Sequence, residues 1–210
     1  MILFAKAPVA GRVKTRLAAA VGAEQAAELH RAFVADALDK LCEFMQIADV
    51  ELHTDIASDA WQEARVARDL QAAGDLELKL LHALRRGLEA GRPLVMILGS
   101  DSPTLPRGHI ERLLGARSDV ALGPCEDGGY YAIACRRSDP AMFAGVEWST
   151  ANVLADTERA ARACGLSVER GELWYDVDGP EDLARLLKEQ SLPRHTAAAI
   201  QTIRNPGRIG

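Results

Sequence analysis

The 210-residue sequence has few cysteines, no long apolar run and no acidic side chain in its first 23 residues. Its four cysteines form no C-x-x-C pair and no Cys/His cluster with zinc spacing, so we expect free thiols in a reducing compartment. No apolar stretch approaches the roughly 20 residues of a membrane helix, and the first residues lack the basic start of a signal peptide. We therefore expect a cytoplasmic protein with no membrane partner.

The missing acids at the front contrast with an acidic remainder. The chain has 25 Lys and Arg residues against 30 Asp and Glu residues, a formal charge of −5, which argues against a nucleic-acid partner. Residues 1–23 nevertheless contain Lys6, Arg12, Lys14 and Arg16. A cationic segment in an anionic protein indicates an anionic ligand.

The order of apolar runs and helical periodicities predicts the fold class. Expected strands lie at 2–5, 50–54, 94–98, 119–123, 130–135, 167–169 and 173–175, and expected helices at 23–45, 58–69, 75–90, 107–116, 149–163 and 180–189. This alternation predicts an α/β domain in three layers, α/β/α, with a mostly parallel sheet. We expect one domain over 1–190 and a tail or arm over 191–210, where periodicity is sparse.

The loop after the first expected strand carries most of the front cations. Ligands bind at the carboxyl ends of the strands in such sheets. Gly11 allows close backbone approach, and Lys6, Lys14 and Arg16 supply the charge that a polyphosphate requires. Neither G-x-x-x-x-G-K-[ST] nor G-x-G-x-x-G occurs, and a solvated basic turn is the alternative. The five histidines are scattered, and we interpret them as structural or surface residues.

Acidic residues follow two other expected strands. Asp101 comes just after the apolar run 94–98, a position suited to a hard cation such as Mg²⁺ or Mn²⁺. Asp176 and Asp178 end the last expected strand, and either could complete a metal site with Asp101. Capping of the following helix or turn is the alternative for both Asp101 and Asp178.

The loop 123–131 is dense in polar residues and glycine. Gly128 and Gly129 permit a sharp turn, while Glu126 and Asp127 could contact a sugar hydroxyl, bind metal or act as a base. A hairpin turn explains Asp127 and Gly128 but not the neighbouring Glu126 and aromatic pair. Trp148, before the helix expected at 149–163, is either a core residue or a stacking surface.

Five motifs in order resemble a known family. They are F-A-K-x-P-x-x-G-x-V-K-T-R-L, G-S-D-x-P-x-L, G-P-x-x-D-G-G-Y-Y, W-S-T and Y-D-V-D-x-P-E-D-L, and they cover residues 1 to about 189. Together they resemble the small transferases of the glycosyltransferase-A fold, of the radical-SAM/selenodomain-associated transferase 1 type. The first and last motifs are also similar to 2-phospho-L-lactate guanylyltransferase and, more distantly, to molybdenum cofactor guanylyltransferase.

The resemblance implies a Rossmann-like nucleotide-diphospho-sugar transferase fold and roles for individual residues. It places Lys14 and Arg16 at the phosphates and Asp101 and Asp178 at a metal ion. The predicted nucleotide-binding residues are Lys6, Gly11, Lys14, Arg16, Gln71, Gly74, Asp75 and Ser100. The predicted acceptor-binding residues are Glu126, Asp127, Gly128, Gly129, Tyr130 and Trp148. Lys14, Arg16, Asp101 and Asp127 are the predicted catalytic residues.

Three functions remain open at this point. The first is a Mg²⁺- or Mn²⁺-dependent nucleotidyl transfer from a nucleoside triphosphate to a small anionic acceptor. The second is glycosyl transfer from a nucleotide sugar, with Asp127 or Glu126 as base. The third is a non-catalytic nucleotide-binding module, suggested by the segment 71–80, in which two glycines of the related pattern are replaced and Lys79 stands in place of Arg.

Overall fold

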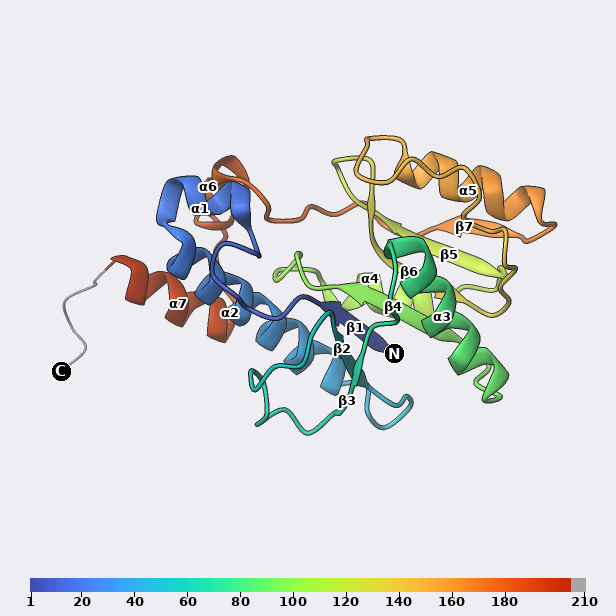
Figure 1. The fold of residues 1–210 in the computed structure, drawn as a ribbon, viewed down its shortest axis with the longest axis horizontal. Coiled ribbons are helices and arrows are strands. Elements are labelled where there is room, and N and C mark those ends of the chain that lie inside the picture. The colour runs from blue at the N-terminus through green and yellow to red at the C-terminus, as the bar shows by residue number, and fades with distance from the viewer. Residues whose placement is uncertain (205–210) are drawn as a thin grey trace.

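The computed structural model describes residues 1–204 and contains one seven-stranded sheet (Figure 1). The strand order is β3-β2-β1-β4-β6-β5-β7, and β6 alone runs antiparallel to its neighbours. The strands are β1 (Ile2–Ala5), β2 (Glu51–Thr54), β3 (Ala67–Leu70), β4 (Val95–Gly99), β5 (Val120–Pro124), β6 (Tyr130–Cys135) and β7 (Val168–Arg170). The mostly parallel sheet predicted from the sequence is confirmed.

Helices cover both faces of this sheet, as the three-layer prediction requires. The helices are α1 (Thr15–Val21), α2 (Ala23–Cys42), α3 (Leu76–Glu89), α4 (Arg107–Leu114), α5 (Val153–Ala163), α6 (Pro180–Leu186) and α7 (Arg194–Arg204). Helices α2 and α4 pack on one face, and α3 and α5 on the other. Within the described range, none of these helices combines the length and the apolar character that a bilayer crossing demands.

Burial on both faces explains why the strands are apolar throughout. In β1, Leu3 and Ala5 join the core under α2 and α4, whereas Ile2 and Phe4 join the core under α3 and α5. Successive side chains of a strand point to opposite faces, so a strand covered on both sides reads as a continuous apolar run. These two cores fix the sheet whose carboxyl-end loops carry the predicted site.

A third, smaller core holds α1, α6 and α7 against α2, to one side of the sheet (Figure 1). It contains Leu17 of α1, Phe33 of α2, Leu186 of α6 and Ile200 of α7. The residues that precede α1 and α6 are therefore anchored close to each other. Within the predicted tail or arm over 191–210, residues Arg194–Arg204 form helix α7, which packs along α2, and 205–210 lie outside the described residues.

The helix predicted at 58–69 is wrong. Turns occupy most of its first half, and β3 pairs with β2 in parallel from Ala67 to Leu70. Two contacts hold this segment in its extended form: Arg68 donates to the carbonyls of Ser58 and Ala60, and Asp69 is paired with Arg86 of α3. Tertiary polar contacts therefore override the local helical pattern.

The segments 173–175 and 149–163 also differ from prediction. Residues 173–175 form no strand, although Trp174 makes an isolated bridge to Cys125. Helix α5 begins at Val153 rather than 149, because Ser149 has a left-handed φ of 64° that a helix cannot include. Thr150 instead turns the chain by donating to the Glu147 carbonyl and accepting from the Asn152 N–H.

Candidate active site

A cavity of about 590 Å³ opens at the carboxyl ends of β1 and β4. Most of the residues predicted to bind nucleotide or metal line it, although they come from separate segments: Lys6, Lys14, Arg16, Gln71, Gly74, Asp75, Ser100, Asp101 and Asp178. The position of this cavity agrees with the general rule that ligands of open α/β sheets bind at the carboxyl ends of the strands. The predicted acceptor-binding residues and Gly11 do not line this cavity.

Lys14 lies at the centre of the polar part of the cavity. Its Nζ is 2.5 Å from Asp101 Oδ1 and 2.6 Å from Asp178 Oδ1, and its side chain is 4% exposed. The residue adopts a left-handed backbone (φ 45°, ψ 44°) immediately before α1. This conformation costs a non-glycine residue about 1–2 kcal/mol, so the ion pairs and the packing around them must hold it in place.

The charges of this triad stabilise one another. Burial opposes the charge on Lys14, but the two carboxylates outweigh it and raise the lysine pKa above its usual value. Burial likewise opposes charge on Asp101, and Lys14 outweighs it so that the pKa of Asp101 is lowered. Two carboxylate oxygens converging on one cationic atom also form a set of hard ligands suited to Mg²⁺ or Mn²⁺. The residues present therefore fit the predicted metal ion.

Backbone contacts place the two carboxylates beside each other. The Val177 N–H donates to the Asp101 carbonyl at 2.8 Å, which joins the loop after β4 to the segment before α6. At the start of α6, the Asp182 carboxylate accepts the N–H groups of Asp178 and Gly179 at 3.0 and 2.7 Å. Asp178 itself is thus free of the capping role that the sequence left open for it.

The first loop is held in place from several sides. The Ala7 N–H donates to Asp55 Oδ1 at 2.7 Å, and Arg12 lies 4.0 Å from the same carboxyl group. Arg16 lies beside Gly179, where an added Cβ would be 3.5 Å from the guanidinium Nη2. Gly11 has a left-handed φ of 77° with open space around it, so it serves the turn of the loop.

His30 is a cavity residue that the sequence did not reveal. It lies on α2, is 4% exposed, and its Nε2 is 2.9 Å from the Lys6 carbonyl oxygen. Burial lowers the pKa of His30, so the ring is neutral at physiological pH. The sequence around His30 has no spacing to another histidine or acid that would indicate a functional residue. His30 reaches the site because α2 packs under the first loop.

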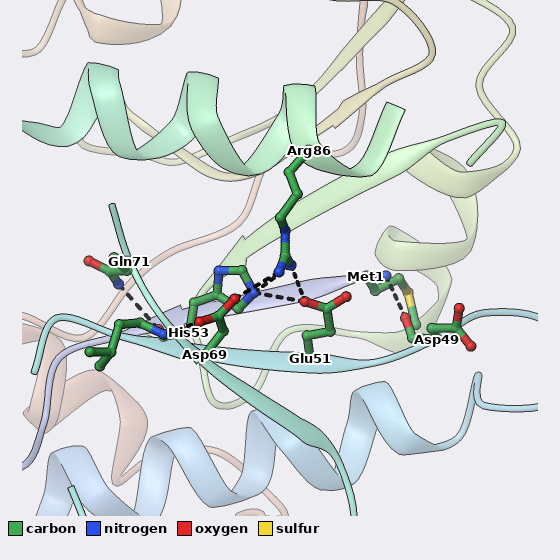
Figure 2. Close-up of polar contacts among 8 residues, drawn as sticks. Met1, Asp49, Glu51, His53, Asp69, Gln71 and Arg86 are labelled. Carbon is green, nitrogen blue, oxygen red and sulfur yellow. Dashed lines mark hydrogen bonds and ion pairs between the residues drawn. The ribbon is translucent and has the colours of Figure 1, made fainter. Parts of the chain in front are cut away.

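Gln71 connects the cavity to the sheet edge (Figure 2). Its Nε2 donates to the carbonyls of Ala5 and His53, each at 3.2 Å, at the ends of β1 and β2. In the same segment, Asp75 caps α3 by accepting the Leu78 N–H at 3.0 Å. These contacts give Gln71 and Asp75 positioning roles at the wall of the cavity.

The loop between β5 and β6 forms a second acidic region at the same end of the sheet. One ligand atom from each of Cys125, Asp127 and Asp176 lies within 4.8 Å of the others. Burial, followed by repulsion from Asp178 and Asp127, raises the pKa of Asp176 to about 7. Burial also raises the pKa of the Cys125 thiol, which therefore stays protonated. Asp127 thus lies close to the segment that carries Asp178.

Glu126 is engaged in an ion pair. Arg185 of α6 binds its two carboxylate oxygens at 2.6 and 3.0 Å, and this pairing lowers the pKa of Glu126. The guanidinium also stacks on Tyr175, 3.8 Å from the ring centroid. The Glu126–Arg185 ion pair therefore links the β5–β6 loop to α6. Because Glu126 is engaged in this pair, Asp127 is the better candidate for a base.

The aromatic residues predicted at the acceptor turn their polar atoms inward. The Tyr130 hydroxyl and the Trp148 Nε1 are buried and have no hydrogen-bond partner among residues 1–204. Both rings pack against the core under α3 and α5, and burial raises the pKa of Tyr130. Binding an acceptor through these polar atoms would require them to move.

The chain is similar in sequence to a known family and to enzymes of known activity. A family model described as "Uncharacterized protein conserved in bacteria (DUF2064)" matches residues 34–150. The chain is similar to a 2-phospho-L-lactate guanylyltransferase of Haloarcula marismortui, with 28% identity over 86% of this chain and 83% of that protein. A second such enzyme, of Halomicrobium mukohataei, is 29% identical over 83% of this chain and 79% of that protein.

Solved structures extend the similarity to the fold. One from Desulfovibrio desulfuricans G20, provisionally assigned as a nucleotide-diphospho-sugar transferase, has a TM-score of 0.85 and 32% identity, and the match covers 98% of this chain and 94% of that chain. CMP:2-keto-3-deoxy-manno-octonic acid synthetase with CTP shares the fold at a TM-score of 0.57 and 13% identity, over 95% of this chain and 97% of that chain. These matches confirm the predicted fold.

Proposed function

This chain belongs to the DUF2064 family and is a transferase with the nucleotide-diphospho-sugar transferase fold, and we propose that it transfers a nucleotidyl group from a nucleoside triphosphate to a small anionic acceptor. The observation that carries this proposal is the cavity in which Lys14 Nζ lies between Asp101 and Asp178. It provides cations for phosphates and hard oxygen ligands for Mg²⁺ or Mn²⁺ within one site. The curated relatives, both guanylyltransferases, make GTP the first donor to test.

The residues of this chain would act mainly by charge and position. Lys6, Lys14 and Arg16 neutralise the triphosphate, and Asp101 and Asp178 hold the divalent cation. When bound, that cation supplies Lewis-acid stabilisation of the α-phosphate and of the leaving pyrophosphate. The rigid β1 and β4 ends fix these groups relative to each other, which is the main protein contribution to phosphoryl-type transfer.

The proposed nucleotidyl transfer needs no dedicated base. An oxygen of the acceptor forms a bond to the α-phosphorus, and the bond from that phosphorus to the oxygen bridging the α- and β-phosphates breaks. Pyrophosphate leaves with that bonding pair. Because an anionic acceptor brings its own nucleophilic oxygen, no side chain needs to remove a proton. We propose that this acceptor binds beside Asp127, Gly128 and Gly129, since Asp127 lies close to Asp176 in the segment that carries Asp178.

Glycosyl transfer is the second candidate. The structure from Desulfovibrio desulfuricans, 32% identical, is provisionally assigned as a nucleotide-diphospho-sugar transferase. A sugar-accepting hydroxyl needs a base in an inverting reaction. Asp127 suits that role because it is exposed and makes no ion pair within the described residues. The two candidates share the donor phosphate site and differ in the bond that breaks.

Product analysis separates these functions. The protein is incubated with Mn²⁺, candidate small anionic acceptors and each common nucleoside triphosphate or nucleotide sugar. Nucleotidyl transfer releases pyrophosphate from a triphosphate, whereas glycosyl transfer releases a nucleoside diphosphate from a nucleotide sugar. Nucleotide binding with neither product across all donors and acceptors contradicts both and supports a non-catalytic module.

A further inference from the structure

Lys14 occupies the position that the proposed divalent cation needs. Its ammonium contacts both Asp101 and Asp178, and neither carboxylate has another cationic partner among the described residues. Lys14 was predicted to bind donor phosphate, yet its side chain is withdrawn from solvent, while those of Asp101 and Asp178 are 44% and 37% exposed. A divalent cation on these two oxygens and an ammonium in the same place would repel each other strongly.

We infer that Lys14 is a displaceable internal cation: it neutralises Asp101 and Asp178 in the free protein and moves to the donor phosphates when a divalent cation takes its place. This inference rests on the proposed function for the identity of the donor. The lysine stem provides the means, because a flexible four-carbon chain can redirect its ammonium while the backbone stays in place. Phosphate oxygens then replace the two carboxylates as partners of the Lys14 ammonium, because an unpaired charge in a buried site is strongly destabilising.

The surroundings of Lys14 can stabilise its ammonium in two positions. The cavity wall beside it carries Arg16 and Lys6, so the phosphates that would receive Lys14 bind within its reach. In the present position the ammonium also lies 5.8 Å from the Phe33 ring centroid, on the fully buried side of the site. The consequence is coupled binding: metal and donor bind together, and the free protein binds metal weakly.

Direct metal titration tests this inference without any activity assay. Mn²⁺ binding to the free protein is measured by electron paramagnetic resonance for the wild type, Lys14→Met and Arg16→Met. We expect Lys14→Met to bind Mn²⁺ at least tenfold more tightly than the wild type. Arg16→Met removes the same charge two residues further along, in the first turn of α1, from a residue that pairs with neither carboxylate among those described, and it should change the affinity less than threefold.

A folded Lys14→Met variant whose Mn²⁺ affinity equals or falls below that of the wild type overturns the inference. So does an Arg16→Met variant that gains as much affinity, because general charge would then explain both. If Lys14→Met does not fold, the side-chain ¹⁵N signal of Lys14 in the wild type decides, assigned by its loss in Lys14→Arg. That signal should shift as Mg²⁺ is raised until its binding saturates, and a signal that stays fixed at saturation contradicts displacement.

These outcomes are independent of the proposed function. Tighter Mn²⁺ binding by Lys14→Met with no pyrophosphate from any donor would leave the displaceable cation in place and reject nucleotidyl transfer. Pyrophosphate release by the wild type with unchanged metal affinity in Lys14→Met would do the reverse.

Discussion

At the scale of single residues, the proposed function depends on a few charges brought together from distant segments. Asp101 follows β4, Asp178 precedes α6, and Lys14 precedes α1. The lowered pKa of Asp101 keeps its carboxylate charged across the physiological range. Lys14 and Asp101 therefore each have one ionisation state at the site, and substitution of any of the three residues alters the charge balance of the other two.

Replacing Asp101 by Asn tests its role as a metal ligand. The amide keeps the size of the side chain but removes the charge that binds both Lys14 and the cation, so we expect pyrophosphate release to fall about 100-fold. The rate is measured with saturating Mn²⁺ and donor. Asp59→Asn is the matched control, because Asp59 is exposed and its carboxylate accepts a hydrogen bond only from Gln62 among residues 1–204. A loss below threefold in Asp101→Asn would remove this residue from the machinery.

At the scale of elements, the turn between β5 and β6 is the predicted acceptor side of the site. Gly128 has a φ of 89°, and a Cβ added there would lie 2.0 Å from the Ala151 carbonyl oxygen. The Gly128 carbonyl also accepts the Leu154 N–H in the first turn of α5. The turn and the start of α5 are therefore built as one unit in which only glycine fits.

A pair of glycine substitutions separates backbone strain from this close approach. Gly128 and Gly145 both have positive φ, but a Cβ at Gly145 meets nothing within 4 Å. We expect Gly145→Ala to reduce the free energy of unfolding by about 1 kcal/mol and Gly128→Ala by about 3 kcal/mol or more. Urea denaturation measures both. Equal losses would show that contact with Ala151 carries no cost.

Elements with strong apolar patterns were the predictable part of this fold. The buried strands β1 and β4 are apolar at successive positions because both sheet faces are covered. β3 was missed because its four residues are exposed, so no alternation marks it as a strand. α7 was missed because it buries only Thr196 and Ile200, too few residues for a helical stripe.

The candidate site could likewise be predicted only in part from the sequence. Strand-end position and the resemblance together identified Asp101, Asp178 and Lys14 as neighbours. The mutual ion pairs were not predictable, because they need a left-handed backbone at Lys14 that sequence alone does not indicate. Likewise, the pairing of Glu126 with Arg185 joins two segments far apart in the chain. Local pattern cannot reveal such contacts.

At the scale of the whole molecule, pH acts on stability through a polar network around the buried His53 near the sheet edge (Figure 2). His53 of β2 is 3% exposed, with Nε2 2.8 Å from Glu51 Oε2 and 3.0 Å from Arg86 Nη2. Burial lowers the His53 pKa below 6.5. As the pH falls below about 6.5, the unfolded chain binds a proton that the folded protein does not, so folding becomes less favourable.

The contribution of His53 is isolated by comparing two proteins at two pH values. The raised pKa of Asp176 acts in the opposite direction, since its folded form gains a proton as the pH falls through about 7, but it is common to both proteins. We therefore expect His53→Gln to lose less stability than the wild type between pH 7.5 and pH 5.5 in urea titrations. A larger loss in the variant would contradict the direction of the His53 shift.

The central claim is that the cavity between β1, β4 and the start of α6 binds a nucleoside triphosphate with a divalent cation. Thermal unfolding with Mn²⁺ and a panel of nucleotides tests it most directly. A donor at about 100 times its Kd adds about 2.7 kcal/mol to the folded state, which for a chain of this size raises Tm by about 5–10 °C. We predict that rise with a triphosphate, GTP first, and its loss in Asp101→Asn. A rise with nucleotide sugars alone, or with no nucleotide, would contradict the claim.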